Sequence, residues 1–162
     1  MHKSGVRNRA IFLTTVLALI GAFSLMCSGT ASAQVMLVTN EYTTDMDIDG
    51  NYDELCIEVL IQNSEPFPVD FWVLGTLLDG GLNYIETAPA VWTGMLPPFG
   101  LTTVTLIFDG PPIYRYGANG PFNIYIEDWE FGGPPSTFMW YLTNPYAYTD
   151  FEAPAELTPP AQ

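Results

Sequence analysis

Apolar and polar residues alternate along much of the chain after residue 34, and this alternation predicts β-strands. In Leu55–Gln62 every second residue is apolar, which is the period of a half-buried strand. No window after residue 34 keeps a helical period over three turns. The pattern predicts strands or extended segments at 34–44, 55–62, 69–78, 82–86, 88–93, 101–108, 122–127, 137–142 and 146–152.

Turns rich in Gly and Pro separate these short segments, and there is no internal repeat. Short strands with such turns every 8 to 12 residues are typical of sandwiches. We therefore expect an all-β protein, a single immunoglobulin-like or jelly-roll-type β-sandwich of about seven or eight strands.

The N-terminal segment reads as an export signal. A basic start precedes the apolar run Ile11–Met26, and Ala31-Ser32-Ala33 is a small-residue cleavage site. The alternative is a retained membrane anchor, although the run is short for a full span. We expect residues 1–33 to be a cleaved signal peptide and the protein to be secreted, in the extracellular space or at the cell surface.

The rest of the chain divides by composition. Residues 34–44 are expected to be an N-terminal strand or arm, and residues 45–153 the β-sandwich domain. Residues 154–162 are rich in Pro and Ala, which predicts a disordered tail.

Removal of the signal leaves a strongly acidic chain. All 18 acidic residues remain, with Arg115 as the single basic one, so the net charge is −17. Such a surface repels phosphate backbones and anionic lipid headgroups, so we expect neither a nucleic acid partner nor a membrane partner after cleavage. It attracts divalent cations. A solubilising charge, or adaptation to a salty or acidic medium, would give the same excess.

The stretch Asp45–Asp53 reads D-x-D-x-D-G-x-x-D and is the candidate metal site. Calcium takes six to eight oxygen ligands from carboxylates, backbone carbonyls and water. Alternating carboxylates around a Gly turn let a short loop fold over one ion. The candidate ligands are Asp45, Asp47, Asp49 and Asp53 through their carboxylates and Asn51 through its carbonyl.

This loop departs from the EF-hand pattern. The twelfth position, counted from Asp45, is Cys56 where an EF-hand has Glu. Glu54, Glu58 or Asp109 would have to complete the set of ligands. The alternative is a solvated acidic turn, because Asp and Gly are also ordinary turn residues.

Several motifs together resemble a β-sandwich module of exported and cell-surface proteins of bacteria and archaea. The resemblance covers roughly 45–152 and implies the fold and the location more than an activity. Its motifs are D-x-D-G-x-Y-D-x-L, L-x-F-D-G-x-x-I, G-x-x-G-P-F and Y-x-Y-x-D-F-E. They correspond to Asp47, Asp49, Gly50, Tyr52, Asp53 and Leu55; Leu106, Phe108, Asp109, Gly110 and Ile113; Gly117, Gly120, Pro121 and Phe122; and Tyr146, Tyr148, Asp150, Phe151 and Glu152.

Composition removes most catalytic chemistries. After residue 33 the chain has no His and no Lys, so His-based triads, Schiff bases and His metal sites are excluded. Cys56 is then a lone cysteine, and its place in an apolar strand favours burial over a bond between chains. Glu127, Asp128 and Glu130 could support a carboxylate glycosidase, but such runs are usually solvated. We expect a protein that is not an enzyme.

The leading hypothesis is a calcium-stabilised structural or adhesive protein of the cell surface. It would bind other surface proteins, glycans or copies of itself, with 34–44 adding as a strand to a neighbour's sheet. The alternative is an extracellular carbohydrate-binding module, in which Trp72 and Trp129 stack on sugar rings.

The cleavage site gives the first prediction. The exported protein should begin at Gln34, as read from its intact mass. Ala33→Arg should block processing, because the enzyme requires a small residue there. Ser32→Arg is the matched control and should be processed normally. An exported protein that retains residues 1–33 would support the membrane anchor instead.

Overall fold

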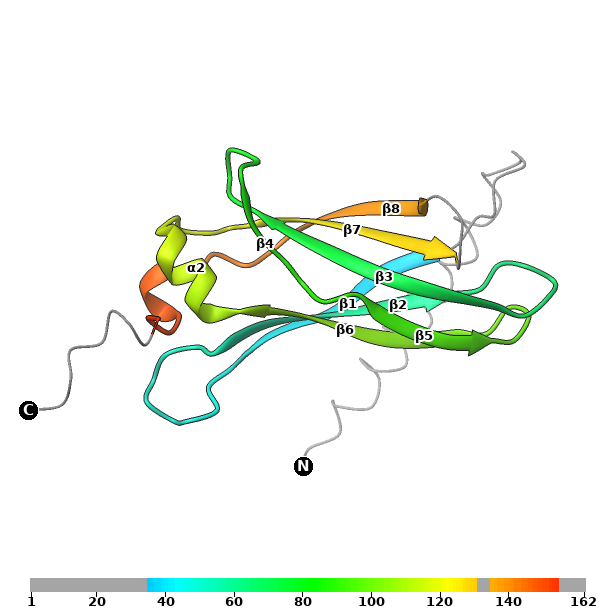
Figure 1. Ribbon diagram of the computed structural model, residues 1–162, viewed down its shortest axis with the longest axis horizontal. Coiled ribbons are helices and arrows are strands. Elements are labelled where there is room, and N and C mark those ends of the chain that lie inside the picture. Colours follow the sequence, from blue (N-terminus) through cyan, green and yellow to red (C-terminus); the bar gives the residue numbers. More distant parts are fainter. Residues whose placement is uncertain (1–34, 131–134, 155–162) are drawn as a thin grey trace, which may run out of the picture.

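The computed structural model describes residues 35–130 and 135–154, which form two antiparallel sheets packed face to face (Figure 1). The first sheet has the order β1-β2-β6, with β1 (Val35–Thr44), β2 (Glu54–Gln62) and β6 (Leu101–Asp109). The second has the order β4-β3-β7-β8, with β3 (Val69–Leu78), β4 (Tyr84–Thr87), β7 (Asn123–Glu130) and β8 (Pro135–Leu142). β5 (Val91–Leu96) pairs with β3 on the same edge as β4.

This arrangement confirms the predicted all-β sandwich of about eight strands. The first, second and sixth strands share one sheet, and the third, seventh and eighth share the other. That connectivity matches the A-B-E and C-F-G strands of an immunoglobulin-like sandwich. The segment expected to be a strand or arm is β1, which pairs with β2 of its own chain from Val35 to Thr44.

Period-two patterning places one face of each central strand in the core. The predicted inward residues of β2 are all fully buried, and those of β3, β6 and β7 meet them from the neighbouring strands and the facing sheet. Full burial of each such side chain contributes about 1.5–3 kcal/mol, so this interface is the main stabilising term. The fully buried residues of these four strands are Leu55, Ile57, Val59, Ile61, Phe71, Val73, Leu77, Leu106, Phe108, Ile124 and Ile126.

Gly75 shows how closely the sheets approach. It lies on the inward face of β3, and a Cβ built there would be 2.8 Å from Leu106 Cδ1 and 3.0 Å from Phe108 Cζ, both in the opposite sheet. A glycine is therefore required at this point by packing between the sheets rather than by backbone conformation.

A short helix, α2 (Gly110–Tyr116), stands where the sequence indicated only a turn and loop. Seven residues are too few to produce a helical period. Pro occupies the first turn, where the missing N–H costs nothing, and Gly117 ends the helix at φ 74°. Within residues 35–130 and 135–154, no helix has the length and apolar character required to cross a membrane.

Three other expected boundaries differ from the structure. The segment 82–86 begins later, as β4, because Leu82 adopts a positive φ in the hairpin turn. The segment 88–93 is shifted to β5. The segment 146–152 is a 3₁₀ turn, η1 (Tyr148–Asp150), followed by a single parallel bridge between Phe151 and Tyr52. Phe151 is fully buried against Phe122, so this segment closes one end of the core.

Glu41 of β1 links the two sheets. Its carboxylate accepts hydrogen bonds from the hydroxyls of Tyr141 (2.6 Å) and Tyr146 (2.7 Å) and from the backbone N–H of Asn144 (3.0 Å). Burial, reinforced by the Glu41 charge, raises the pKa of Tyr141 to about 12 and raises that of Tyr146 further. One acidic side chain thus joins β1 to β8 and to the segment after it.

Cys56 is buried, as its place in β2 suggested. It lies on the outward face of the first sheet, in register with Tyr42 on β1 and Ile107 on β6. Burial, together with the nearby charge of Glu54, raises the pKa of the Cys56 thiol to about 11. The thiol is therefore protonated and unreactive at neutral pH.

The Glu41 contacts predict a loss of stability in alkali. Because folding raises the pKa values of Tyr141 and Tyr146, the stability they contribute is complete below about pH 10 and is lost as the pH rises toward 12. Melting temperatures measured from pH 8 to 12 should fall in this window. Glu41→Ala should cost about 2 kcal/mol at pH 7 and flatten the alkaline decline. Glu58→Ala, on the outer face of β2, is the control and should do neither.

Candidate functional site

The acidic loop, residues 45–53, is the connection between β1 and β2 (Figure 1). Its base is held by backbone hydrogen bonds from three directions. Tyr52 N–H donates to Asp150 O at 2.7 Å, Glu152 N–H donates to Tyr52 O at 3.0 Å, and Gly110 N–H donates to Asp53 O at 2.6 Å. The loop therefore rests on η1 and α2, at one end of the sandwich.

Gly110 explains part of the F-D-G motif. A Cβ at this position would collide with the carbonyl oxygens of Tyr52 and Asp53, so only glycine lets the start of α2 approach the loop. Ile113, three residues later, is fully buried and anchors α2 to the core. The motif thus fixes the place of the acidic loop.

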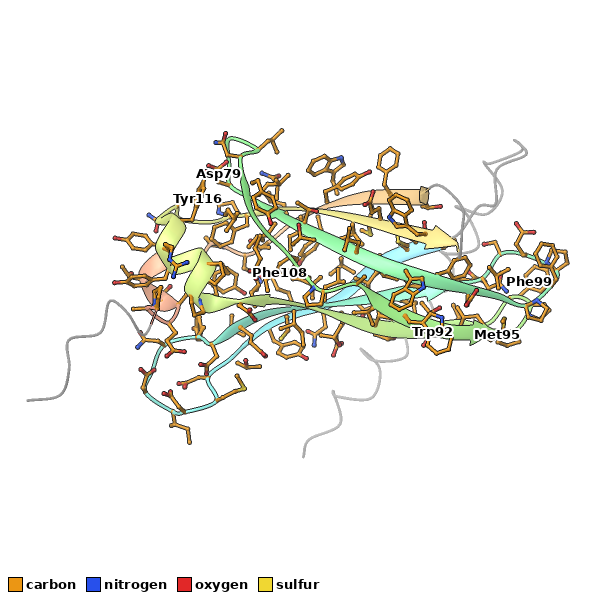
Figure 2. The ribbon with its side chains drawn as sticks, viewed as in Figure 1. Asp79, Trp92, Met95, Phe99, Phe108 and Tyr116 are labelled. Carbon is orange, nitrogen blue, oxygen red and sulfur yellow. The ribbon has the colours of Figure 1, made fainter. Side chains whose placement is uncertain are left out.

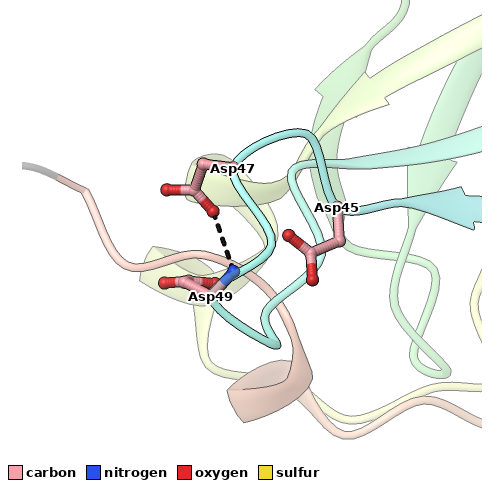
Figure 3. Close-up of side chains that lie close together, drawn as sticks. All are labelled: Asp45, Asp47 and Asp49. Carbon is pink, nitrogen blue, oxygen red and sulfur yellow. Dashed lines mark hydrogen bonds between the residues drawn. The ribbon is translucent and has the colours of Figure 1, made fainter.

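Three of the expected metal ligands converge in this loop, as Figure 3 shows. One carboxylate oxygen from each of Asp45, Asp47 and Asp49 lies within 4.8 Å of the other two. Asp45 accepts hydrogen bonds from Ile48 N–H (2.7 Å) and Gly50 N–H (3.1 Å), and Asp47 accepts one from Asp49 N–H (3.2 Å). The backbone N–H groups of the loop thus hold the acids together.

The other two expected ligands lie beside these three. Asp49 accepts hydrogen bonds from Asn51 N–H (2.8 Å) and from the Asn51 amide Nδ2 (3.0 Å). Asp53 accepts a hydrogen bond from Met46 N–H, which is the largest cause lowering the pKa of Asp53. A hydrogen bond shared with Glu152 lowers it further.

Glu152 is the acid that the sequence did not indicate. Its hydrogen bond with Asp53 and repulsion from Asp53, Asp47 and Asp49 raise the pKa of Glu152. Almost a hundred residues separate it from the loop, and only the parallel bridge at Phe151 brings it there. Of the acids considered as completing ligands, Glu54 instead accepts a hydrogen bond from Thr44 Oγ1 at 3.0 Å. The resulting cluster offers the hard oxygen donors that calcium takes.

A second candidate site covers the outer face of the five-stranded sheet. Trp72 on β3 is in register with Trp129 on β7 and with Trp92 on β5, so three tryptophans from three strands form one row. Each is more than a third exposed, and the rings of Trp72 and Trp92 stack with centroids 6.5 Å apart. The two predicted binding residues are therefore neighbours, and Trp92 joins them.

A second aromatic group lies further along the same face. Tyr125 on β7 packs against Trp140 and Phe138 on β8, with ring centroids 5.1 and 5.8 Å apart. Phe138 and Trp140 are each more than half exposed. Tyr125 is four residues from Trp129 on the same strand, so the two groups are roughly 13 Å apart. We call these six residues the aromatic face: Trp72, Trp92, Tyr125, Trp129, Phe138 and Trp140.

Carboxylates border the aromatic face. Asp70 accepts a hydrogen bond from the indole N–H of Trp92 at 3.2 Å. Burial and the charge of Glu127 raise the pKa of Tyr125, to which Glu127 is hydrogen-bonded. These groups are acceptors for a polar ligand lying on the rings.

The acids considered for glycosidase chemistry do not converge. Asp128 is fully buried on the inner side of β7 and accepts a hydrogen bond from Thr137 N–H at 2.6 Å. Strand alternation directs Glu127 to the outer face. These two neighbours therefore lie on opposite sides of the sheet; the side chain of Glu130 is outside the described part.

Comparisons with known proteins give only distant matches. No protein-family model matches the sequence, and no curated protein matches it significantly. Among solved structures, the chain is similar to β-glucosidase 3B of Thermotoga neapolitana in complex with glucose, at 9% identity over 67% of this chain and 16% of that one, with a TM-score of 0.41. It is also similar to a β-glucosidase of Paenibacillus barengoltzii, at 12% identity over 72% and 14%, with a TM-score of 0.44.

A third match is a β-galactosidase of Bacteroides fragilis, described as putative in its title, at 14% identity over 70% of this chain and 17% of that one, with a TM-score of 0.45. The chain thus spans between 14% and 17% of the length of these three proteins. Likenesses at this level carry no argument about function.

Proposed function

We propose that the protein is an exported adhesive module that binds carbohydrate through its aromatic face and is stabilised by calcium at its acidic loop. The aromatic face is the observation that carries the proposal. Six aromatic residues from four strands share one side of a sheet, and five of them are exposed. Exposed apolar surface of this extent marks a binding site.

The chemistry of the face favours a sugar. One side of a sugar ring presents C–H groups that stack on flat aromatic rings, while its hydroxyls need hydrogen-bond acceptors. Trp72 and Trp140 supply rings on a rigid sheet, and Asp70 and Glu127 supply acceptors beside them. A chain with net charge −17 repels acidic polysaccharides, so the ligand is a neutral glycan.

The proposed activity is binding without turnover. Glycoside hydrolysis requires two carboxyl groups that flank one bond, roughly 5–10 Å apart. Glu127 and Asp128 lie on opposite sides of β7.

Assembly by strand addition is the second form of the adhesive function. β1 is an edge strand and is already paired with β2 of its own chain. A neighbour's β1 would therefore have to replace the chain's own strand rather than fill an empty edge. This exchange would also break the Glu41 contacts with Tyr141 and Tyr146, so we give the aromatic face the main role.

Calcium would act at the acidic loop as a stabilising ion. Asp45, Asp47, Asp49 and Asp53 would supply carboxylate oxygens, Asn51 a carbonyl oxygen, and Glu152 an additional carboxylate from the C-terminal segment. A cation among these groups would offset their mutual repulsion and displace the proton that Glu152 retains. It would thereby tie β1, β2 and the segment after η1 together.

Glycan binding can be tested on insoluble and soluble neutral polysaccharides by pull-down and affinity electrophoresis. Trp72→Ala and Trp140→Ala each remove one ring from one aromatic group. Together they should weaken binding at least tenfold, since each aromatic contact contributes about 1 kcal/mol or more. Tyr84→Ala, an equally exposed aromatic on β4 away from this face, should leave binding intact. Undiminished binding by the folded double variant would contradict the proposal.

Calcium binding predicts a rise in melting temperature at millimolar calcium, reversed by EGTA. Asp47→Asn with Asp49→Asn keeps the oxygens that accept backbone N–H groups but removes two charges. This variant should lose the calcium-dependent rise and melt higher than the wild type without calcium. Asp79→Asn changes another turn-capping acid, which accepts hydrogen bonds from Gly81 and Asn83, and should retain the rise. A wild-type melting temperature indifferent to calcium would rule out this stabilisation.

A further inference from the structure

The end of the sandwich opposite the acidic loop carries exposed apolar side chains. Phe67 lies in the β2–β3 loop, and Met95, Phe99 and Leu101 flank or lie in the β5–β6 loop. Each is more than half exposed, and Figure 2 shows Met95 and Phe99 at this end. We call these four residues the apolar tip.

A buried asparagine makes the two loops of the tip one rigid unit. Asn63 is fully buried, and its amide Nδ2 donates to the carbonyl oxygens of Phe67 (2.9 Å), Pro97 (3.0 Å) and Leu96 (3.2 Å). Its backbone N–H donates to Gly100 O at 2.9 Å. The apolar side chains are thus presented by an ordered scaffold and need little further ordering to bind.

Phe99 has an uncommon backbone conformation. Its φ of 57° is in the left-handed region, which bulky side chains rarely adopt. The side chain is exposed, so packing into the core does not account for this conformation. Strain held in place by the surrounding structure often marks a binding site.

Charge is distributed unevenly between the two ends. Within residues 63–69 and 95–101, Glu65 is the single charged residue. The opposite end holds Asp45, Asp47, Asp49, Asp53 and Glu152 close together. The tip is therefore the part of the surface where approach to another apolar phase meets the least repulsion and desolvates the fewest charges.

We propose that the apolar tip inserts into the interfacial region of a lipid bilayer with zwitterionic headgroups. The four side chains expose roughly 400 Å², about half of the 800 Å² per partner that a stable protein interface buries. Insertion of a few aromatic and aliphatic side chains at a bilayer surface has no such area requirement. The tip has no Lys or Arg to attract anionic headgroups, so the membrane is uncharged at its surface.

The course of the chain also favours a membrane at this end. β1 begins at Val35, which pairs with Gln62, and Gln62 pairs with Leu101 of the tip. The predicted export signal therefore joins the domain beside the tip. A precursor held by its apolar run would present this end to the bilayer. The expectation of no membrane partner rested on repulsion from anionic lipid, which does not apply to zwitterionic surfaces.

Vesicle flotation of the processed protein tests the proposal. The protein should float with phosphatidylcholine vesicles and bind less as phosphatidylglycerol is added at low salt. Phe99→Ser with Leu101→Ser should reduce the bound fraction at least tenfold, and Phe67→Ser alone should reduce it measurably. Phe138→Ser with Leu142→Ser is the matched control, since both pairs replace one Phe and one Leu of nearly equal exposure, and it should bind as the wild type does.

Three results would overturn the proposal. The first is no flotation with phosphatidylcholine, and the second is an equal loss in both pairs, which would indicate general stickiness. The third is self-association on size-exclusion chromatography without lipid that only the tip pair abolishes, because the tip would then bind a second copy. Glycan binding should be the same in the tip pair and the wild type, so failure here is distinguishable from failure of the proposed function.

Discussion

The scarcity of positive charge is the constraint on which the rest of the structure depends. With 18 carboxylates and Arg115 as the single basic residue after the predicted signal, ion pairs cannot neutralise the acids. The buried interface between the sheets must outweigh this self-repulsion. The carboxylates are stabilised by neutral donors instead, as Glu41 is by two tyrosine hydroxyls and Asp79 by Asn83 and Tyr116.

Where donors run out, the carboxyl groups hold protons or gather around a point that suits a cation. Burial raises the pKa of Glu86 to about 7, and Asp109 nearby adds repulsion. Glu152 keeps its proton more readily because Asp53, Asp47 and Asp49 surround it. The acidic loop is thus the place where neutral donors suffice least, and a bound calcium ion would relieve the largest local repulsion.

Local sequence patterns predicted what depends on neighbouring residues. The period-two run of β2 gave the buried set Leu55, Ile57, Val59 and Ile61, and the Asp spacing gave the converging group in the loop. What depends on pairing between distant strands was not readable. Trp72 and Trp129 were candidates, but a sequence does not reveal that Trp92 shares their row. Glu152 and the seven-residue helix α2 were missed because one needs a distant bridge and the other is too short for a period.

The acidic charge and the apolar surfaces are two parts of one physical arrangement. Exposed aromatics on a sheet face and an apolar tip would ordinarily promote aggregation. A net charge of −17 keeps copies of the domain apart at long range, so the domain can expose these surfaces and remain dispersed. Neutral glycans and zwitterionic lipids are not repelled by this charge, whereas nucleic acids and anionic lipids are. The charge therefore selects the partners of the apolar surfaces without contacting them, and salt or calcium, by screening it, weakens that selection.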